Sequence, residues 1–208
     1  EALTDYIEQK EDAKLEPLYF DIVLNKIFLH LFYYKNYEVA YSQITSVINR
    51  LDGRDLENIL NNKHYCNGSY FYSAINYLMI YHRLKNDEKN ALRILDYLMN
   101  GIITKAINAN LKAMFISIQI NCLFEYVFLY KRRDLLAYLQ NLLDYQIHSN
   151  QLDRLYFTYY MLSGHYYNLK DFENANRYFA LMIASGTSSG DDIQFKELIA
   201  SLDSEFLN

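Results

Sequence analysis

Apolar residues recur every three or four positions along most of this chain, which is the spacing of one face of an α-helix. Two of the clearest series are Ala40, Ile44, Val47, Ile48 and Leu51, and Phe172, Ala175, Phe179, Met182 and Ile183. The sequence therefore predicts an all-α fold.

The series and the breaks between them predict four helical hairpins. The first (A) helices are expected at residues 18–33, 69–83, 108–130 and 153–168, and the second (B) helices at 37–50, 88–100, 134–148 and 172–185. Shorter helices are expected at 1–12 and 54–62, and a capping helix at 191–206. Three glycines follow apolar series and are predicted to be left-handed C-terminal caps, namely Gly53, Gly101 and Gly186.

The turns of these hairpins repeat in sequence. The segment from Lys35 to Ala40 matches the segment from Lys170 to Ala175 position for position. The segments Lys85–Ala91 and Lys131–Ala137 follow the same theme with one extra residue each, and every segment brings a small alanine into the second helix. Repeated hairpins of this kind resemble long, degenerate tetratricopeptide units.

Because one helical hairpin cannot cover its own apolar face, such units stack on one another. We predict a single helical-repeat domain over residues 1–208, a right-handed superhelix of hairpins with a concave side. The hairpins are expected at 18–50, 69–100, 108–148 and 153–185.

Composition and charge narrow the function. With one proline and six glycines among 208 residues, a turn-rich β-sandwich is disfavoured. The net charge is −5, whereas a nucleic-acid-binding domain usually carries a basic face. The run Lys131-Arg132-Arg133 is interpreted as a solvated turn, so this chain alone is not expected to bind DNA. No uncharged apolar run reaches the roughly 20 residues of a membrane span, so no membrane partner is expected.

Candidate chemistry is scarce. Cys66 and Cys122 are far apart and lack a C-x-x-C companion, and the first residues do not resemble a secretion signal, which together favour a cytoplasmic protein. The five histidines are scattered, and no hydrolase, phosphate-loop or dinucleotide motif is present. We predict no catalytic residues, no metal site and no cofactor, and a protein that is not an enzyme.

Asparagine occupies a recurrent position. Asn25 and Asn121 each lie ten residues before the lysine of the following turn, Asn76 lies nine before its lysine, and Tyr160 takes this place in the fourth repeat. Asparagine is unfavourable inside a helix. A row of amides on the concave side would offer donors and acceptors to an extended peptide backbone. The other interpretation is that these amides satisfy backbone groups between hairpins or face water, and both interpretations stay open.

Further candidate peptide contacts lie one helical turn before the asparagines. They are Asp21, Tyr72 and Ser117, each four residues before one of the three. Tyr156 and Tyr160, with Tyr159 between them, are candidates for an aromatic wall. Tyrosine stripes at helical spacing also serve simply as packing between helices.

Several segments resemble a known family. They are Ile120-Asn121-Cys122-Leu123, Leu142-Leu143-Asp144, and Ser163-Gly164-His165-Tyr166-Tyr167 followed by Lys170. Together they resemble the C-terminal repeat domain of Rgg/GadR/MutR-type transcriptional regulators, within the wider group of Gram-positive peptide-pheromone receptors used in quorum sensing. The resemblance is clearest over residues 110–183.

The resemblance implies more than the spacing does. Members of the family carry an N-terminal helix-turn-helix domain that contacts DNA, and their repeat domains form homodimers and bind a short, often hydrophobic peptide on the concave face. Peptide binding then changes transcription. The helix-turn-helix is not found in this sequence, which begins without methionine, so we expect either the peptide-sensing part of a longer protein or a relative that naturally lacks the DNA-binding domain. Only Asn121 falls in a directly matching stretch, and the expected seat of dimerisation is residues 134–206.

Two other functions stay open. A helical-repeat scaffold for a protein partner, without a peptide ligand, is the main alternative. A repeat-domain enzyme or an inhibitor of a response regulator is a weaker one. A helix-turn-helix encoded upstream of Glu1 would favour the regulator, and its absence would favour the scaffold.

Overall fold

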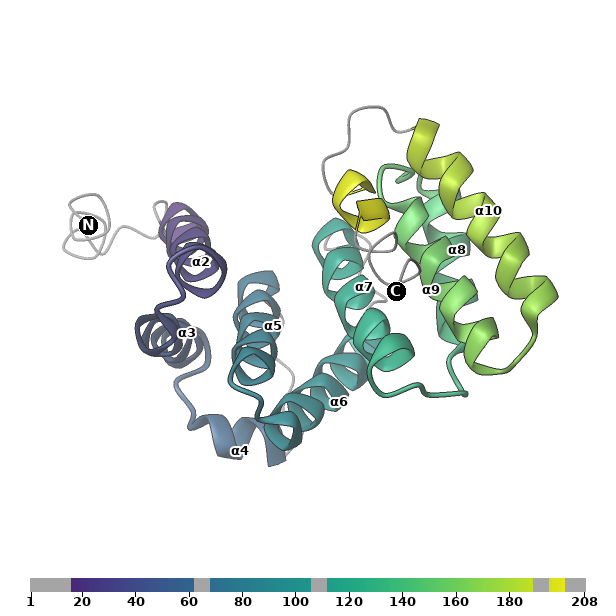
Figure 1. Cartoon of the computed structure of the whole chain (residues 1–208). Coiled ribbons are helices and arrows are strands. Elements are labelled where there is room, and N and C mark those ends of the chain that lie inside the picture. Colours follow the sequence, from purple (N-terminus) through teal and green to yellow (C-terminus); the bar gives the residue numbers. More distant parts are fainter. Residues whose placement is uncertain (1–15, 62–67, 106–111, 189–194, 201–208) are drawn as a thin grey trace. The chain divides into compact units, whose positions relative to one another are not determined.

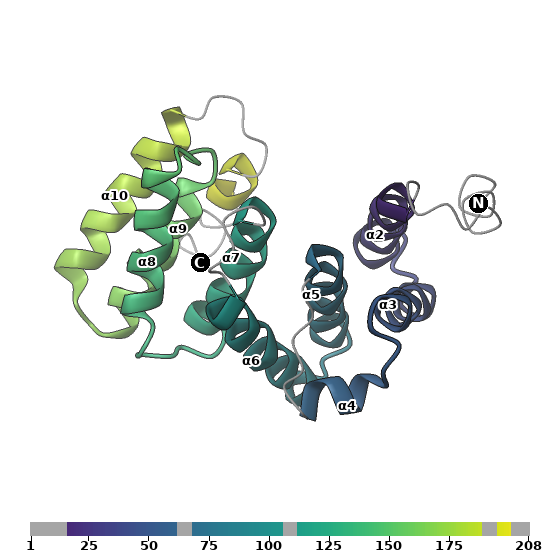
Figure 2. The ribbon, with the colours of Figure 1, turned by 180° about the vertical axis from the view of Figure 1, so that it is seen from behind.

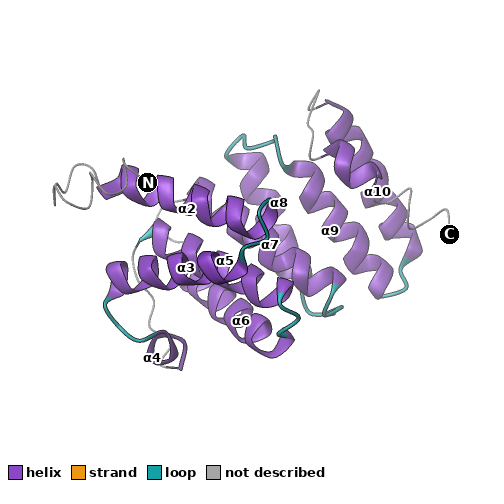
Figure 3. Ribbon diagram, turned by 60° about the vertical axis from the view of Figure 1, so that its left-hand side comes forward, coloured by secondary structure: helices purple, strands orange, loops and turns teal. Residues whose placement is uncertain are grey.

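A computed structural model of the chain describes residues 16–61, 68–105, 112–188 and 195–200 (Figure 1). Every element in these ranges is a helix, which confirms the predicted all-α class (Figure 3). The chain divides into two compact units, residues 1–119 and 120–208, and each is described by itself. The right-handed superhelix therefore stays a prediction.

The first unit is a set of helices that pack against one another in pairs. It contains α2 (Glu16–Phe32), α3 (Tyr37–Asp52), α4 (Leu56–Asn61), α5 (Ser69–Leu84) and α6 (Glu88–Lys105). Helix α2 packs on α3, α3 on α5, and α5 on α6, while α2 also touches α5 (Figure 1). In α3, the apolar face read from the sequence is buried as expected, through Ala40, Ile44, Val47 and Ile48.

The second unit centres on α9. Helix α7 (Lys112–Phe128) crosses from the first unit into the second, which continues with α8 (Leu136–His148), α9 (Leu155–Asn168) and α10 (Phe172–Ser188). Helix α9 packs against both α8 and α10, and the three helices lie together in Figure 2. The amide of Asn168 in α9 donates to the carbonyl oxygen of Val127 at 2.8 Å, which ties α9 to α7.

The predicted helices overlap the observed ones throughout the described ranges. The expected helix at 1–12 lies outside these ranges, and of the expected capping helix only 195–200 is described, where it is helical. None of the helices in the described ranges combines the length and the apolar composition that a membrane span requires.

A left-handed residue marks each of the four hairpin turns. These residues are Lys35, Asn86, Lys131 and Lys170, with φ of 51°, 57°, 48° and 64°. In the second turn the left-handed position is therefore Asn86 and not Lys85. Counted from it, the alanine of the next helix lies five residues on in the first, second and fourth turns, so the extra residue predicted in the second turn was wrong.

Only one of the three predicted glycine caps exists. Gly53 has φ 70° and its N–H donates to the carbonyl oxygen of Asn49 at 2.7 Å, which confirms it as the left-handed cap of α3. Gly101 and Gly186 instead lie inside α6 and α10, so those two predictions were wrong. Both helices continue past the glycine, and Gly186 is a packing position, described below.

The third turn departs from the other three. Ala40, Ala91 and Ala175 are buried at the start of their helices, as predicted, but Ala137 is exposed. Helix α8 begins after Leu135, and the N–H of Leu139 donates to the Leu135 carbonyl oxygen, as that of Ala40 does to Asn36. Leu139, which is fully buried, therefore takes the place predicted for Ala137.

The second and fourth turns share one cap. Asp87 accepts from the backbone N–H and the side-chain amide of Asn90, at 3.3 and 2.7 Å, and Asp171 accepts the same two bonds from Asn174, at 3.2 and 2.8 Å. The bonds from these asparagines hold the pKa of each aspartate below its usual value. The repeat seen in sequence is thus a repeat in hydrogen bonding.

A glycine at a left-handed turn position is expected to stabilise the fold. A lysine there is held in backbone geometry that glycine adopts freely, so Lys170→Gly should raise the free energy of unfolding by about 0.5–1 kcal/mol. Arg177→Gly, on the exposed side of α10, is the matched control and should lower it by about 1 kcal/mol. Urea denaturation of the two variants measures both values; destabilisation at position 170 would contradict the left-handed geometry.

Candidate functional site

The recurrent asparagines share one register when they are counted from the left-handed residue of each turn. Asn25, Asn76 and Asn121 all lie ten residues before it, as Tyr160 does in the fourth repeat. Asn76, which the sequence placed one residue out of step, is in step because Asn86 is the left-handed residue. The four positions therefore fall at the same depth of α2, α5, α7 and α9.

Two of these amides face solvent. Asn25 and Asn121 are exposed, and neither has a hydrogen-bond partner among the described residues. Next to Asn121, the Cys122 side chain points into the core, where burial raises the pKa of its thiol. An exposed asparagine inside a helix costs helix propensity. At Asn25 and Asn121 no bond within the described chain offsets that cost.

Asparagines outside the recurrent position form the structural hydrogen bonds to backbone and capping groups that were the alternative interpretation of Asn25, Asn76 and Asn121. Asn36 caps α3 by accepting from the N–H of Val39 at 3.4 Å, and Asn90 and Asn174 bind the capping aspartates. Asn168 donates to the backbone of α7. These four lie at helix ends, whereas Asn25 and Asn121 lie in helix interiors without such a bond.

Asn76 differs from the other two because it is only 7% exposed. Its side-chain oxygen is buried and has no hydrogen-bond partner. A buried acceptor without a partner costs about 1–3 kcal/mol of folding free energy. A ligand that brought a hydrogen-bond donor to this oxygen would recover that free energy on binding. Of the three asparagines, Asn76 therefore has the strongest requirement for a hydrogen-bond donor, although its small exposed fraction limits what can reach it.

The first repeat contributes Asp21, which joins α2 to α5. The Tyr70 hydroxyl donates to the Asp21 carboxylate, and the Tyr70 ring stacks on Phe20 with centroids 5.2 Å apart. Burial, together with the negative charge of Asp21, raises the pKa of Tyr70. Asp21 is exposed and lies one turn before Asn25. A ligand that bound the Asp21 carboxylate would either share it with the Tyr70 hydroxyl or replace that hydroxyl as its hydrogen-bond donor.

The other predicted contacts divide by burial. Ser117 is half-buried on α7, and Tyr160 is half-buried on α9, stacked on Phe128 with centroids 4.6 Å apart. Tyr72 and Tyr156 are fully buried and serve as packing residues in their units. In this conformation Tyr72 and Tyr156 offer no surface to a ligand, and both pack between helices, which was the alternative interpretation of the tyrosines.

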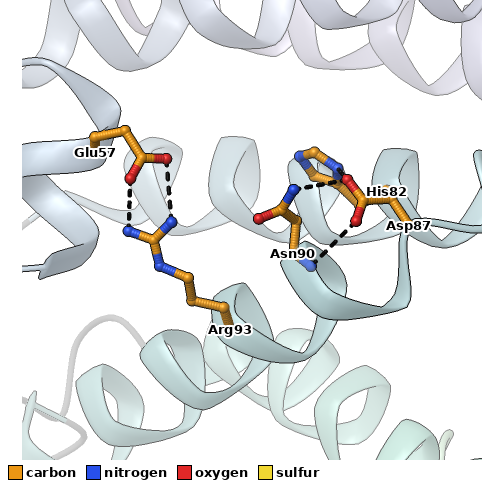
Figure 4. A network of polar contacts seen from close by, with 5 residues as sticks. All are labelled: Glu57, His82, Asp87, Asn90 and Arg93. Carbon is orange, nitrogen blue, oxygen red and sulfur yellow. Dashed lines mark hydrogen bonds and ion pairs between the residues drawn. The ribbon is translucent and has the colours of Figure 1, made fainter.

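The sequence did not single out a polar network in the first unit (Figure 4). Nδ1 of His82 lies 2.9 Å from the Asp87 carboxylate, the same group that caps α6. Nearby, Arg93 of α6 donates two bonds to Glu57 of α4, at 2.8 and 3.1 Å, which lowers the pKa of Glu57. The signal that could have revealed it is the Asp-x-x-Asn spacing of a helix cap.

This network fastens elements rather than presenting reactive groups. Both carboxylate oxygens of Asp87 are engaged by Asn90, and one of them also by His82. The Arg93–Glu57 pair joins α4 to α6. Within the described residues, no group of three or more His, Cys, Asp or Glu side chains could hold a metal ion. The exposed amides of Asn25 and Asn121, by contrast, have donors and acceptors that no described residue engages.

Comparison of the chain with protein-family models, with curated proteins and with solved structures found no match in any of the three. The function proposed below therefore draws on the chain's own residues and on the sequence resemblance.

Proposed function

We propose that this chain is the peptide-sensing domain of a transcriptional regulator of the Rgg type. It binds a short signalling peptide through the asparagines that recur on the A helices of its hairpins. The single observation that carries the proposal is the shared position of Asn25, Asn76 and Asn121, ten residues before the left-handed residue of each turn. Two of these amides are exposed without a partner, and the third has a buried oxygen without one.

The asparagine row suits a peptide because an amide matches both groups of a peptide bond. Each Asn side chain can accept from a backbone N–H and donate to a backbone carbonyl. Such bonds do not depend on the side chains of the peptide, so they contribute affinity without sequence specificity. Apolar ligand side chains would add burial against half-buried aromatic residues such as Tyr160.

Regulation follows if the peptide binds one arrangement of the hairpins better than another. A ligand shifts a conformational equilibrium only by its difference in affinity for the two states. In the proposed regulator, the peptide shifts a homodimer whose DNA contacts come from a helix-turn-helix domain outside this sequence. The dimer and the DNA domain rest on the family resemblance described above.

A peptide selection tests the proposal. The chain is immobilised and exposed to a synthetic library of random eight-residue peptides, and the retained peptides are identified by mass spectrometry. We expect retention of a set rich in apolar residues. The matched controls are the double variants Asn25→Ala/Asn121→Ala, which should lose the set, and Asn49→Ala/Asn141→Ala, with exposed asparagines on B helices, which should keep it.

Two results would contradict the proposal. Retention of no peptide above the background of the bare support would favour the scaffold interpretation. Equal retention by the two double variants would remove the asparagine row from the binding site.

A further inference from the structure

The ring of Phe195 occupies a seat formed by α9 and α10. Phe195 belongs to the helical segment 195–200 and is only 7% exposed. Its ring meets Tyr156 edge-on, with centroids 5.3 Å apart, and Met182 completes the buried cluster. The third wall is Gly186, where a Cβ atom would overlap the Phe195 ring.

Gly186 shows that the seat is shaped for a ring. Glycine inside a helix costs about 1 kcal/mol relative to alanine, and Gly186 lies inside α10. The missing side chain is what lets the ring approach the helix backbone. Glycine at this position lowers helix stability but leaves space for an aromatic ring, so we interpret Gly186 as a residue that accommodates an aromatic side chain.

A single side chain is the main anchor of segment 195–200. Phe195 alone is buried, Leu198 and Ile199 are partly buried against the same cluster, and the other three residues are exposed. Six helical residues contribute little stability of their own. Among the described residues of the segment, it is therefore chiefly Phe195 that holds it on α9 and α10.

The seat adjoins a residue of the proposed peptide site. Tyr160, at the repeat position that asparagine holds in the other hairpins, packs against the cluster of Tyr156, Met182 and Phe195. Tyr156 was a candidate peptide contact by sequence, and it is Phe195 that packs on its ring. If Phe195 left, an aromatic-lined seat would open beside Tyr160.

We propose that the Phe195 seat is the subsite for an aromatic side chain of the bound peptide, and that the chain's own segment 195–200 fills it until a peptide displaces it. The inference rests on the proposed function for the identity of the ligand. A tethered occupant competes at a high effective concentration, so the apparent affinity for a free peptide is the intrinsic affinity multiplied by the small fraction of molecules whose seat is open. The segment thus sets the peptide concentration at which the domain responds.

The test uses the full chain and a peptide supplied in trans. The probe is a fluorescein-labelled peptide with the sequence of residues 193–200, and the variant is Phe195→Ala, which empties the seat. In fluorescence polarisation we expect the variant to bind the probe at least tenfold more tightly than the original chain does. A probe with alanine in place of its phenylalanine should not bind, and adding Gly186→Leu to the variant, which fills the seat, should abolish binding.

Equal affinity of the original chain and Phe195→Ala for the probe would overturn the proposal, as would no binding to a variant whose circular dichroism is unchanged. Hydrogen exchange on the original chain gives a result that does not depend on any variant. We expect the amides of 195–200 to exchange at least a hundredfold faster than those in the middle of α9. Equal protection would make the segment part of the core and would also overturn the proposal.

Failure here is distinguishable from failure of the proposed function. The trans probe does not need the asparagines, so a negative result with it removes the seat and leaves the peptide selection standing. A negative peptide selection removes the proposed function, and with it the assignment of the seat to a signalling peptide.

Discussion

Replacing Gly164 by threonine is expected to lower the free energy of unfolding by about 3 kcal/mol, because the new side chain has no room. Gly164 lies inside α9, and a Cβ atom there would be 2.5 Å from Cε1 of Phe128 and 3.0 Å from Cγ1 of Val127. Both neighbours belong to α7, and the Phe128 ring is also stacked on Tyr160, so relieving the overlap must displace that ring from its packing. Urea denaturation followed by circular dichroism measures the loss.

The control for this substitution is Gly68→Thr. Gly68 precedes α5 in an extended conformation, φ −99° and ψ 135°, and a Cβ atom there meets nothing within 4 Å. Threonine caps a helix about as well as glycine, so a change within about 0.5 kcal/mol is expected. Equal losses at positions 164 and 68 would contradict the close approach of α7 and α9.

The second large effect tests the register of the third hairpin. Leu139 is fully buried, so Leu139→Ala should lower the free energy of unfolding by about 2–5 kcal/mol. Ala137 is exposed, so Ala137→Leu should change it by less than about 0.5 kcal/mol. Thermal and urea unfolding of the two variants provide the measurement.

The alanine periodicity of the sequence predicts the reverse order, because it places Ala137 against the neighbouring helix. A larger loss from Ala137→Leu than from Leu139→Ala would therefore restore the register read from sequence and contradict the observed turn. The comparison needs no assumption about function.

Helix positions could be predicted from sequence because apolar spacing is a local signal. The apolar series from Ala40 and from Phe172 lie in α3 and α10, where the structure has them. The exact turns could not be read, because Lys85 and Asn86 are both compatible with a left-handed residue in sequence. Gly186 shows the same limit: a glycine can end a helix or admit a neighbour's ring, and only the packing of Phe195 distinguishes the two.

The candidate site was predicted in position but not in burial. The recurrence of Asn25 and Asn121 is a sequence fact, and both side chains are exposed. That Asn76 is buried and that Tyr156 lies under Phe195 depends on contacts between distant segments, which one helical pattern does not encode. Periodicity gives the face of a helix, whereas burial depends on what packs against that face.

The affinity of Asn121→Ala for a peptide retained in the selection tests the central claim most directly. We predict binding weaker by about 1–3 kcal/mol, which is roughly 5- to 150-fold, because a desolvated backbone group of the peptide loses its partner. The same variant should unfold no more easily than the original chain, since alanine is the better helix former. Asn141→Ala should bind the peptide as the original chain does. Unchanged affinity of Asn121→Ala in a fluorescence-polarisation titration would contradict the claim that the recurrent asparagines hold the peptide.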